Sequence, residues 1–175
     1  MRIVLIAAQS LDGFITRHDE PGTAFTSPED KSHFRAALAG FDACLFGAET
    51  YRVSRVFIRA QFPGHGLRVV LTRTPGRFAA DAAPGELEFT SAAPAAIADD
   101  LRARGIRQCA LLGGAHAHSL FLDAGLVDEI WLTVEPLLFG GGTPLLAHQS
   151  NLRLELQAVE RLGAHPLLLK YRVTR

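Results

Sequence analysis

The sequence predicts a single α/β domain over residues 1–175, with helices on both faces of a mostly parallel sheet. Three observations predict this three-layer αβα class. Four short runs rich in Val, Ile and Leu are almost continuously apolar, as in strands that are buried on both faces. Helical patterns lie between several of these runs, which is typical of α/β domains. Beyond Val127, strand patterns follow one another without a helix, which indicates antiparallel strands at one edge of the sheet.

The expected elements are placed along the chain by their hydrophobic patterns. Buried strands are expected at 3–8, 43–46, 67–71 and 109–112. Helices are expected at 28–41, 94–104 and 115–126, where apolar residues recur at helical spacing. Strands at 128–135, 152–159 and 166–173 form the antiparallel edge, and Pro and Gly mark loops at 61–66 and 74–85.

The composition argues against several classes of function. The net charge is zero and the pI is about 7.1, so we expect neither a nucleic-acid partner nor a membrane partner. Cys44 and Cys109 each lie inside an apolar run, which is typical of buried reduced thiols and predicts a cytoplasmic protein. His116 and His118 are two residues apart and diverge on a helix, so no metal site is predicted.

Glycines, hydroxyl groups and one arginine follow the predicted strands, at the edge of the sheet where α/β proteins bind ligands. Gly113 and Gly114 lead into a helix whose first turn, Ala115 and His116, offers free backbone N–H groups to a phosphate. Taken alone, such a glycine pair is equally typical of ordinary turn geometry. If it holds a phosphate, Gly113→Val is expected to abolish ligand binding and to leave the fold intact.

Two further strand ends have the same character. Gly47 and Thr50 follow the second strand and form another corner for a phosphate. Thr72 and Arg73 follow the third strand, and the planar guanidinium suits a further phosphate. Two phosphate corners and a third cation fit a dinucleotide that carries an extra 2′-phosphate.

Asp30 lies in the first turn of the helix that begins after Ser27, and two roles are open to it. In one, Asp30 is the reciprocal partner of a capping box with Ser27. In the other, it faces inward with Phe34, because it leads the apolar stripe by helical spacing, and its carboxyl group binds a substrate or relays a proton.

Three segments resemble a known family. SLDGFI near the start, TSPED, and LLGGAHAHSLFLDAGLVDEIWLTVEPLLFGGGTPLL at 111–146 resemble the reductase domain of the riboflavin-biosynthesis deaminase-reductases. The resemblance implies the dihydrofolate reductase-like fold, NADPH as cofactor and a pyrimidine- or pterin-like small molecule as substrate. It implies that the nicotinamide borders the loop from Ser10 to Gly13. The segment from Pro28 to Phe34 also resembles the dihydrofolate reductase helix whose acid binds the pterin, which makes Asp30 the candidate catalytic residue at the substrate.

The resemblance also assigns further residues and partners. The residues implied on the substrate side are Ser10, Asp12, Ser27 and Glu29, and those implied on the cofactor side are Gly13, Gly47, Thr50, Thr72, Arg73, Gly113, Gly114, Ala115 and His116. A homodimer is expected from the apolar C-terminal strands and from the family. Leu112 stands where the family has an acid, so the exact substrate stays open. A dihydrofolate reductase proper and a non-catalytic nucleotide-binding module are the alternative functions.

Overall fold

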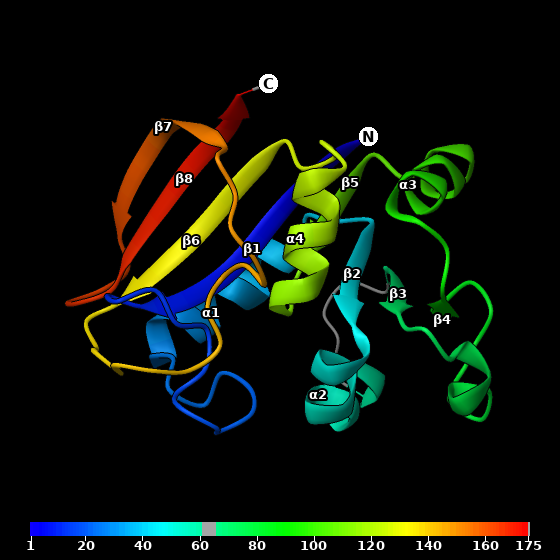
Figure 1. The fold of residues 1–175 in the computed structure, drawn as a ribbon, viewed down its shortest axis with the longest axis horizontal. Helices are drawn as coiled ribbons and strands as arrows, with labels where there is room; N and C mark the ends of the chain where they lie inside the picture. The colour runs from blue at the N-terminus through cyan, green and yellow to red at the C-terminus, as the bar shows by residue number, and fades with distance from the viewer. Residues whose placement is uncertain (61–65, 175) are drawn as a thin grey trace.

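One eight-stranded sheet runs through the protein in the order β4-β3-β2-β5-β1-β6-β8-β7 (Figure 1). The computed structural model describes residues 1–60 and 66–174. The strands are β1 Arg2–Ser10, β2 Ala43–Gly47, β3 Leu67–Leu71, β4 Leu87–Thr90, β5 Gln108–Leu111, β6 Glu129–Glu135, β7 Arg153–Arg161 and β8 Leu167–Thr174. The helices are α1 Pro28–Leu38, α2 Ala48–Ala60, α3 Pro94–Ala103 and α4 Ala115–Asp123, with a 3-10 helix, η1, at Pro75–Phe78.

Six neighbouring strands, from β4 to β6, are parallel, so their carboxyl ends share one edge of the sheet. Among the described strands, β8 runs in the opposite direction and pairs antiparallel with both β6 and β7. The expectation for 128–135 was therefore half wrong, because β6 is parallel to β1 and antiparallel only to β8. The reason is that α4 carries the chain back along the sheet, and a strand that follows such a crossover enters in the parallel direction.

The helices lie in two layers, one on each face of the sheet. Leu5 and Leu45 belong to a buried cluster on one face that includes α3 and α4. Val4 and Phe46 belong to a second cluster on the other face, with α1 and α2. In Figure 1, α4 lies in front of the sheet and α1 behind it. The predicted three-layer α/β architecture is thus confirmed.

The hydrophobic pattern missed α2 and β4. Helix α2 buries Tyr51 and Ile58, which are seven residues apart, but its Val56 is 82% exposed and Ser54 leaves helical geometry at a kink. These features break the apolar stripe that marks a helix. Strand β4 has only four residues, and η1 lies within the expected loop at 74–85. The loop expected at 61–66 lies outside the described residues, apart from Gly66.

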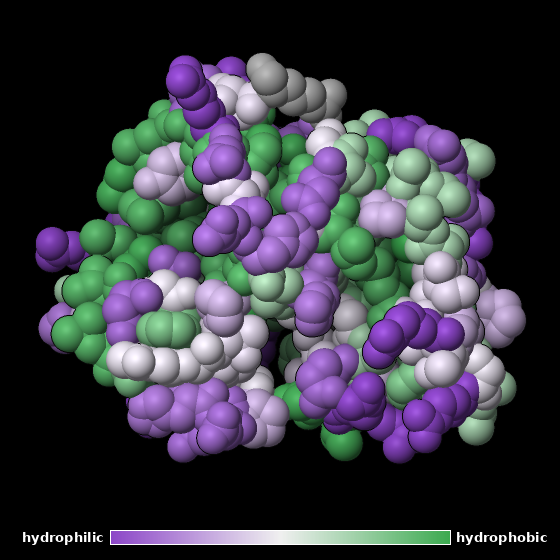
Figure 2. Space-filling model, in the orientation of Figure 1, coloured by the Kyte–Doolittle hydropathy of each residue, from purple (hydrophilic) through white to green (hydrophobic). Residues whose placement is uncertain are grey.

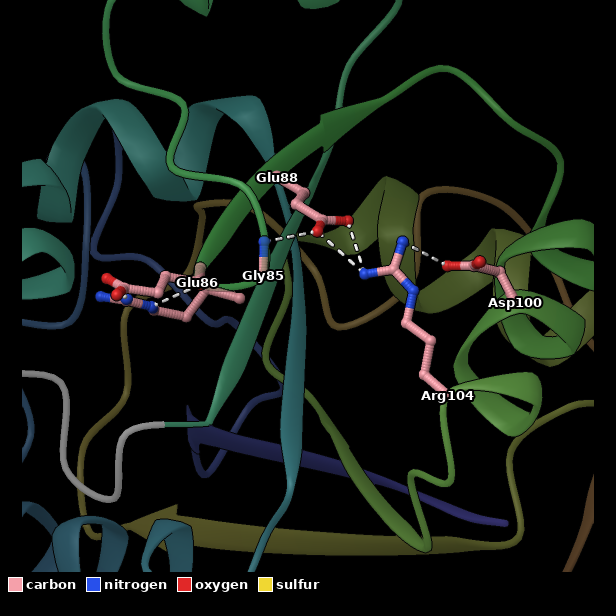
Figure 3. Close-up of polar contacts among 6 residues, drawn as sticks. Gly85, Glu86, Glu88, Asp100 and Arg104 are labelled. Atoms are coloured by element: carbon pink, nitrogen blue, oxygen red, sulfur yellow. Dashed lines mark hydrogen bonds and ion pairs between the residues drawn. The ribbon is translucent and has the colours of Figure 1, made fainter.

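Polar contacts fix the short edge strand β4 to α3 (Figure 3). The Glu88 carboxylate accepts hydrogen bonds from Arg104 Nη1 at 2.8 and 3.0 Å and from the Gly85 backbone N–H at 2.9 Å. Arg104 also pairs with Asp100 at 2.9 Å. The guanidinium beside it lowers the pKa of Glu88. A strand this short makes few ladder bonds, and these contacts hold it against its neighbour.

The sheet face that α3 and α4 cover continues, uncovered by any helix of the described chain, over β7 and β8. Leu154, Leu156 and Val159 lie on this face, since they pair with Val173, Tyr171 and Leu169 in alternation. Leu156 is 53% exposed and Val159 is 55% exposed. Figure 2 shows hydrophobic surface on this side of the molecule. Over residues 1–60 and 66–174, no helix combines the length and the apolar character that crossing a membrane requires.

Candidate functional site

The predicted ligand-binding residues lie in a row along the edge where the parallel strands end. From β3 to β1 the row passes Arg73, Gly47, Gly113 and Ser10, in the order of the strands, and it ends at β6 with Glu135, which was not predicted. Neighbouring strands are about 4.8 Å apart, so the row extends about 19 Å across the strands. Figure 2 shows a hollow in the lower part of the molecule, where Figure 1 places these strand ends.

The two predicted phosphate corners face each other. The Gly47 N–H donates to the Gly113 carbonyl at 2.7 Å, which joins the ends of β2 and β5. A Cβ on Gly114 would lie 3.8 Å from Thr50 Oγ1, and a Cβ on Gly47 would lie 3.8 Å from the Gly114 nitrogen. Residues far apart in the sequence therefore line one small space between the first turns of α2 and α4.

Gly113 and Gly114 are glycines for different reasons. Gly113 is buried and has a φ of +112°, and a Cβ there would lie 3.2 Å from Nε2 of the buried His118. Gly114 is half-buried, has extended backbone (φ −79°, ψ −162°) and would meet nothing closer than 3.8 Å. The peptide bond between them is cis. Gly113 therefore serves the fold, whereas Gly114 leaves bare surface toward Thr50.

This difference corrects one expectation. Gly113→Val was expected to leave the fold intact, but the positive φ and the contact with His118 show that a side chain there disturbs the fold itself. His118 is 1% exposed, and its Nδ1 lies 2.9 Å from the Leu145 carbonyl. Burial lowers the pKa of His118 to about 4, so the ring is neutral and Nδ1 donates to that carbonyl.

The start of α4 is open to an anion. Its N-cap is Gly114, which offers no side-chain acceptor to the first turn. Ala115 is buried and His116 is exposed. The first backbone N–H groups of a helix have no acceptor within it and form the positive end of its dipole. These groups face the space that Gly47 and Thr50 border.

Arg73 lies at the end of the row, just after β3, and its side chain is exposed. In the part of the chain that the structure describes, no carboxylate pairs with its guanidinium. Thr72 lies beside it, half-buried, and its Oγ1 accepts a hydrogen bond from the Thr74 N–H at 3.2 Å. The geometry thus leaves a cation available at this strand end.

The loop after β1 is held by Asp12. The buried Ser10 Oγ donates to Asp12 Oδ1 at 2.6 Å, and Asp12 Oδ2 accepts from the Gly140 N–H at 2.7 Å. The hydrogen bond from Ser10 is the main cause that lowers the pKa of Asp12. Gly13 has a φ of +92° and open space around it. Ser10 and Asp12 therefore shape the loop, and their contact with a substrate stays a prediction.

The capping question at Asp30 has a clear structural answer. Ser27 Oγ accepts from the Asp30 N–H at 3.1 Å, which is one half of a capping box. The other half is taken by Glu135, because the Ser27 N–H donates to Glu135 Oε1 at 2.8 Å. The Asp30 carboxyl group is buried beside Thr133 and Thr26, facing the sheet. Asp30 is therefore free of the capping role that was the alternative for it.

Burial is the main cause that raises the pKa of Asp30, and the charge of Glu135 raises it further. Hydrogen bonds from Thr133 and Thr26 act in the opposite direction. A carboxyl group with a raised pKa at the edge of a ligand site is suited to proton transfer.

Glu29 points away from this group. It is exposed, and its Cγ lies 2.7 Å from where a Cβ on Gly163, in the turn between β7 and β8, would stand. The structure gives no support to its role in substrate binding. Sequence reasoning missed Thr133 and Glu135 instead. Alternation along β6 was the signal that could have found them, since it puts Thr133 and Glu135 on one face with Trp131.

The chain matches the protein family described as the RibD C-terminal domain over residues 2–168. The chain belongs to this family. Its members are riboflavin-pathway reductases, so the resemblance stated from the sequence is confirmed.

Individual relatives agree with this membership. The riboflavin biosynthesis protein RibD of Corynebacterium ammoniagenes is 31% identical over 156 residues, which cover 83% of this chain and 46% of that protein. The chain thus spans about half the length of this curated relative. Among solved structures, a diaminohydroxyphosphoribosylaminopyrimidine deaminase/5-amino-6-(5-phosphoribosylamino)uracil reductase of Thermotoga maritima superposes with a TM-score of 0.81 at 20% identity, covering 99% of this chain and 56% of that one.

A pyrimidine reductase-like protein of Corynebacterium diphtheriae superposes with a TM-score of 0.75 at 19% identity, covering 99% of this chain and 92% of that one. At these identities the solved structures establish the fold, which is the riboflavin-reductase, dihydrofolate reductase-like fold.

The two glycines make separate predictions. Gly114→Ala should keep the fold, because the backbone there is extended and the nearest atom is 3.8 Å from the new Cβ, but should weaken dinucleotide binding. Gly113→Ala should lower the melting temperature, because a side chain at a φ of +112° is strained. Thermal unfolding and cofactor titration of both variants check this. Equal effects of the two substitutions on stability and on binding would contradict the division of roles.

Proposed function

We propose that this protein is an NADPH-dependent reductase that transfers a hydride to a pyrimidine- or pterin-like small molecule, as in riboflavin biosynthesis. The observation that carries the proposal is the buried Asp30 carboxyl group, which is not used for capping. It lies at the β6 end of the same row of strand ends that begins with the phosphate corners of Gly47 and Gly114. Family membership supports an oxidoreductase.

The residues at the strand ends fit NADPH. Gly47 and Gly114 have no contact within the protein that forbids a side chain, so their bare backbone suits the close approach of a pyrophosphate. The start of α4 would hold one phosphate, and Thr50 would contact it from α2. Thr72 and Arg73 would meet the 2′-phosphate. The loop from Ser10 to Gly13 would border the nicotinamide, which supplies the hydride when the cofactor is bound.

The protein's own contribution is to orient the substrate and to handle a proton. Adding a hydride to the carbon of a C=N or C=O bond leaves the nitrogen or oxygen in need of a proton. Asp30 is the group placed to supply it, and Thr133 fixes its carboxyl by a hydrogen bond. Leu112 stands where the family has an acid, so the proposal leaves the exact substrate within the pyrimidine- and pterin-like class open.

Two alternatives remain distinct from this proposal. A dihydrofolate reductase proper would share the cofactor site and differ only in the substrate. A non-catalytic nucleotide-binding module would bind NADPH and leave it unconsumed. NADPH oxidation, followed by absorbance across a panel of dihydrofolate, dihydropterins and ribosylaminopyrimidines, separates the three. If the protein binds NADPH but oxidises it with none of these compounds, the result would favour the non-catalytic nucleotide-binding module.

NADPH should bind more tightly than NADH. A charge-assisted contact between Arg73 and the 2′-phosphate contributes about 1.5–3 kcal/mol, or roughly one to two decades in affinity. Titration of both cofactors by nicotinamide fluorescence measures the ratio of the two affinities, and Arg73→Ala should abolish the preference for NADPH. Arg77→Ala, a neighbouring exposed arginine on η1, is the matched control. Equal affinities for NADPH and NADH in the parent protein would refute the assignment of Arg73.

The protein should form a homodimer through the apolar face of β7 and β8. Leu156 and Val159 are more than half exposed there, and β7 is an unpaired sheet edge in this chain. Leu156→Lys should therefore give a monomer, whereas Val56→Lys, at an exposed valine on α2, should leave the dimer intact. Light scattering at micromolar concentration measures both masses. A parent protein of monomer mass would contradict the proposal.

Asp30→Asn should separate catalysis from stability. The Asp30 backbone N–H still donates to Ser27, so the unfolding free energy should fall by less than about 1 kcal/mol. Turnover should fall by about 10²–10⁴-fold, as for a lost acid–base group, with NADPH affinity unchanged. Unchanged turnover per folded molecule would remove Asp30 from the mechanism.

The pH dependence of stability gives an independent check on Asp30. The pKa of Asp30 is raised in the folded state, so folding favours its protonated form. The contribution of Asp30 to the stability of the fold is therefore complete below the ordinary aspartate pKa. It is lost as the pH rises through the raised value. In Asp30→Asn, the loss of stability that this group causes as the pH rises should be absent from the curve of unfolding free energy against pH.

A further inference from the structure

Glu135 is a buried acid that neither the family resemblance nor the proposed function uses. It is the last residue of β6, it is 3% exposed, and it lies opposite Ser10 in the parallel ladder with β1. Its Oε1 accepts two hydrogen bonds from Ser27, from the backbone N–H at 2.8 Å and from Oγ at 2.8 Å. A carboxylate of the sheet thus caps the helix that carries Asp30.

We propose that Glu135 is a positioning residue that caps α1 and keeps Asp30 as the protonated acid of the site. The proposal rests on the proposed reductase function and assigns the direction of the proton transfer within it. It deepens that function by naming which of two neighbouring buried carboxyl groups gives up the proton.

Glu135 lies where its surroundings favour a negative charge. Its Oε1 accepts hydrogen bonds from two donors of Ser27. The N-terminus of a helix also favours a negative charge beside it. Two buried carboxyl groups near each other resist a second ionisation. Burial and, to a smaller extent, the charge of Glu135 raise the pKa of Asp30, which favours the protonated form of this acid over that of Glu135 in our proposal.

Among the charged groups around Asp30, His33 lowers the pKa of this acid, and this is the smallest of the causes that act on it. From α1, His33 is one turn away, and burial together with Lys170 lowers its pKa, so it is neutral near pH 7. From β8, Lys170 pairs with Glu160 of β7 at 2.6 Å. Glu135 is the charge that β6 contributes. The ammonium group of Lys170 is thus paired with the carboxylate of Glu160.

In the reaction that follows from this proposal, Asp30 gives its proton to the substrate. A hydride adds to the carbon of the substrate's C=N bond, and the electron pair of that bond moves to the nitrogen. The Asp30 carboxyl group gives its proton to this nitrogen and becomes a carboxylate. The substrate is reduced by two electrons, which a bound nicotinamide would supply as the hydride, and Asp30 recovers its proton from water. Glu135 keeps its two hydrogen bonds with Ser27 throughout.

The substitution Glu135→Gln tests this role, because an amide keeps the acceptor oxygen for Ser27 and removes the charge. The pH at which Asp30 titrates, measured by carboxyl-carbon NMR without cofactor or substrate, should fall in the variant. Glu29→Gln, at an exposed acid one residue from Asp30, is the control and should leave the titration unchanged. A midpoint in Glu135→Gln equal to that of the parent would overturn the proposal.

Two further readouts keep the test independent of folding and of activity. In the parent alone, an Asp30 that titrates at or below the ordinary value of 3.8 would also overturn the proposal. In active enzyme, the fall of kcat/KM with rising pH should begin at lower pH in Glu135→Gln, with a tenfold loss for each unit of displacement. Should the parent consume no NADPH, the proposed function fails, and the NMR titration still decides the ionisation of the pair.

Discussion

The parallel pairing of β1 with both β5 and β6 determines where the chemistry of this protein lies. It aligns Leu5 with Leu111 on one side and with Ile130 on the other, so that the three central strands point the same way. Strands β1 and β6 end together at Ser10 and Glu135, and β5 ends opposite Leu5. Glycines and polar groups that are distant in the sequence then meet along one edge. The bond from Gly47 to Gly113 closes that edge between β2 and β5. Without the common direction, the phosphate corners would lie at opposite ends of the sheet.

Along this edge the cofactor side and the substrate side are built differently. The side near Gly47 and Gly114 consists of bare backbone and a helix start, which attract a phosphate by dipole and by close approach. The side near Asp30 consists of buried acids held by Thr133 and Ser27, where burial controls ionisation. The first arrangement binds the negative charge of a phosphate, and the second disfavours the ionised form of Asp30. A reductase needs both, because it must hold an anionic cofactor and deliver a proton.

Most of the fold could be predicted from the sequence, because seven of the eight strands and three of the four helices of the described residues follow clear apolar runs or apolar periods. Helix α2 and strand β4 could not, since the exposed Val56 and a four-residue edge strand give no period to recognise. The inward face of Asp30 followed from helical spacing. The sequence could not show that Asp30 leaves the Ser27 N–H to another acceptor. That acceptor, Glu135, is distant in the sequence, and only the tertiary fold brings it to Ser27.

A crystal structure of the protein with bound NADPH tests the central claim most directly. The account predicts the pyrophosphate between Thr50 and the first turn of α4, with Gly47 and Gly114 against it, the 2′-phosphate at Arg73, and the nicotinamide on the side of Asp30. A nucleotide bound elsewhere on the chain, or one in this place with its nicotinamide turned toward β3, would contradict it.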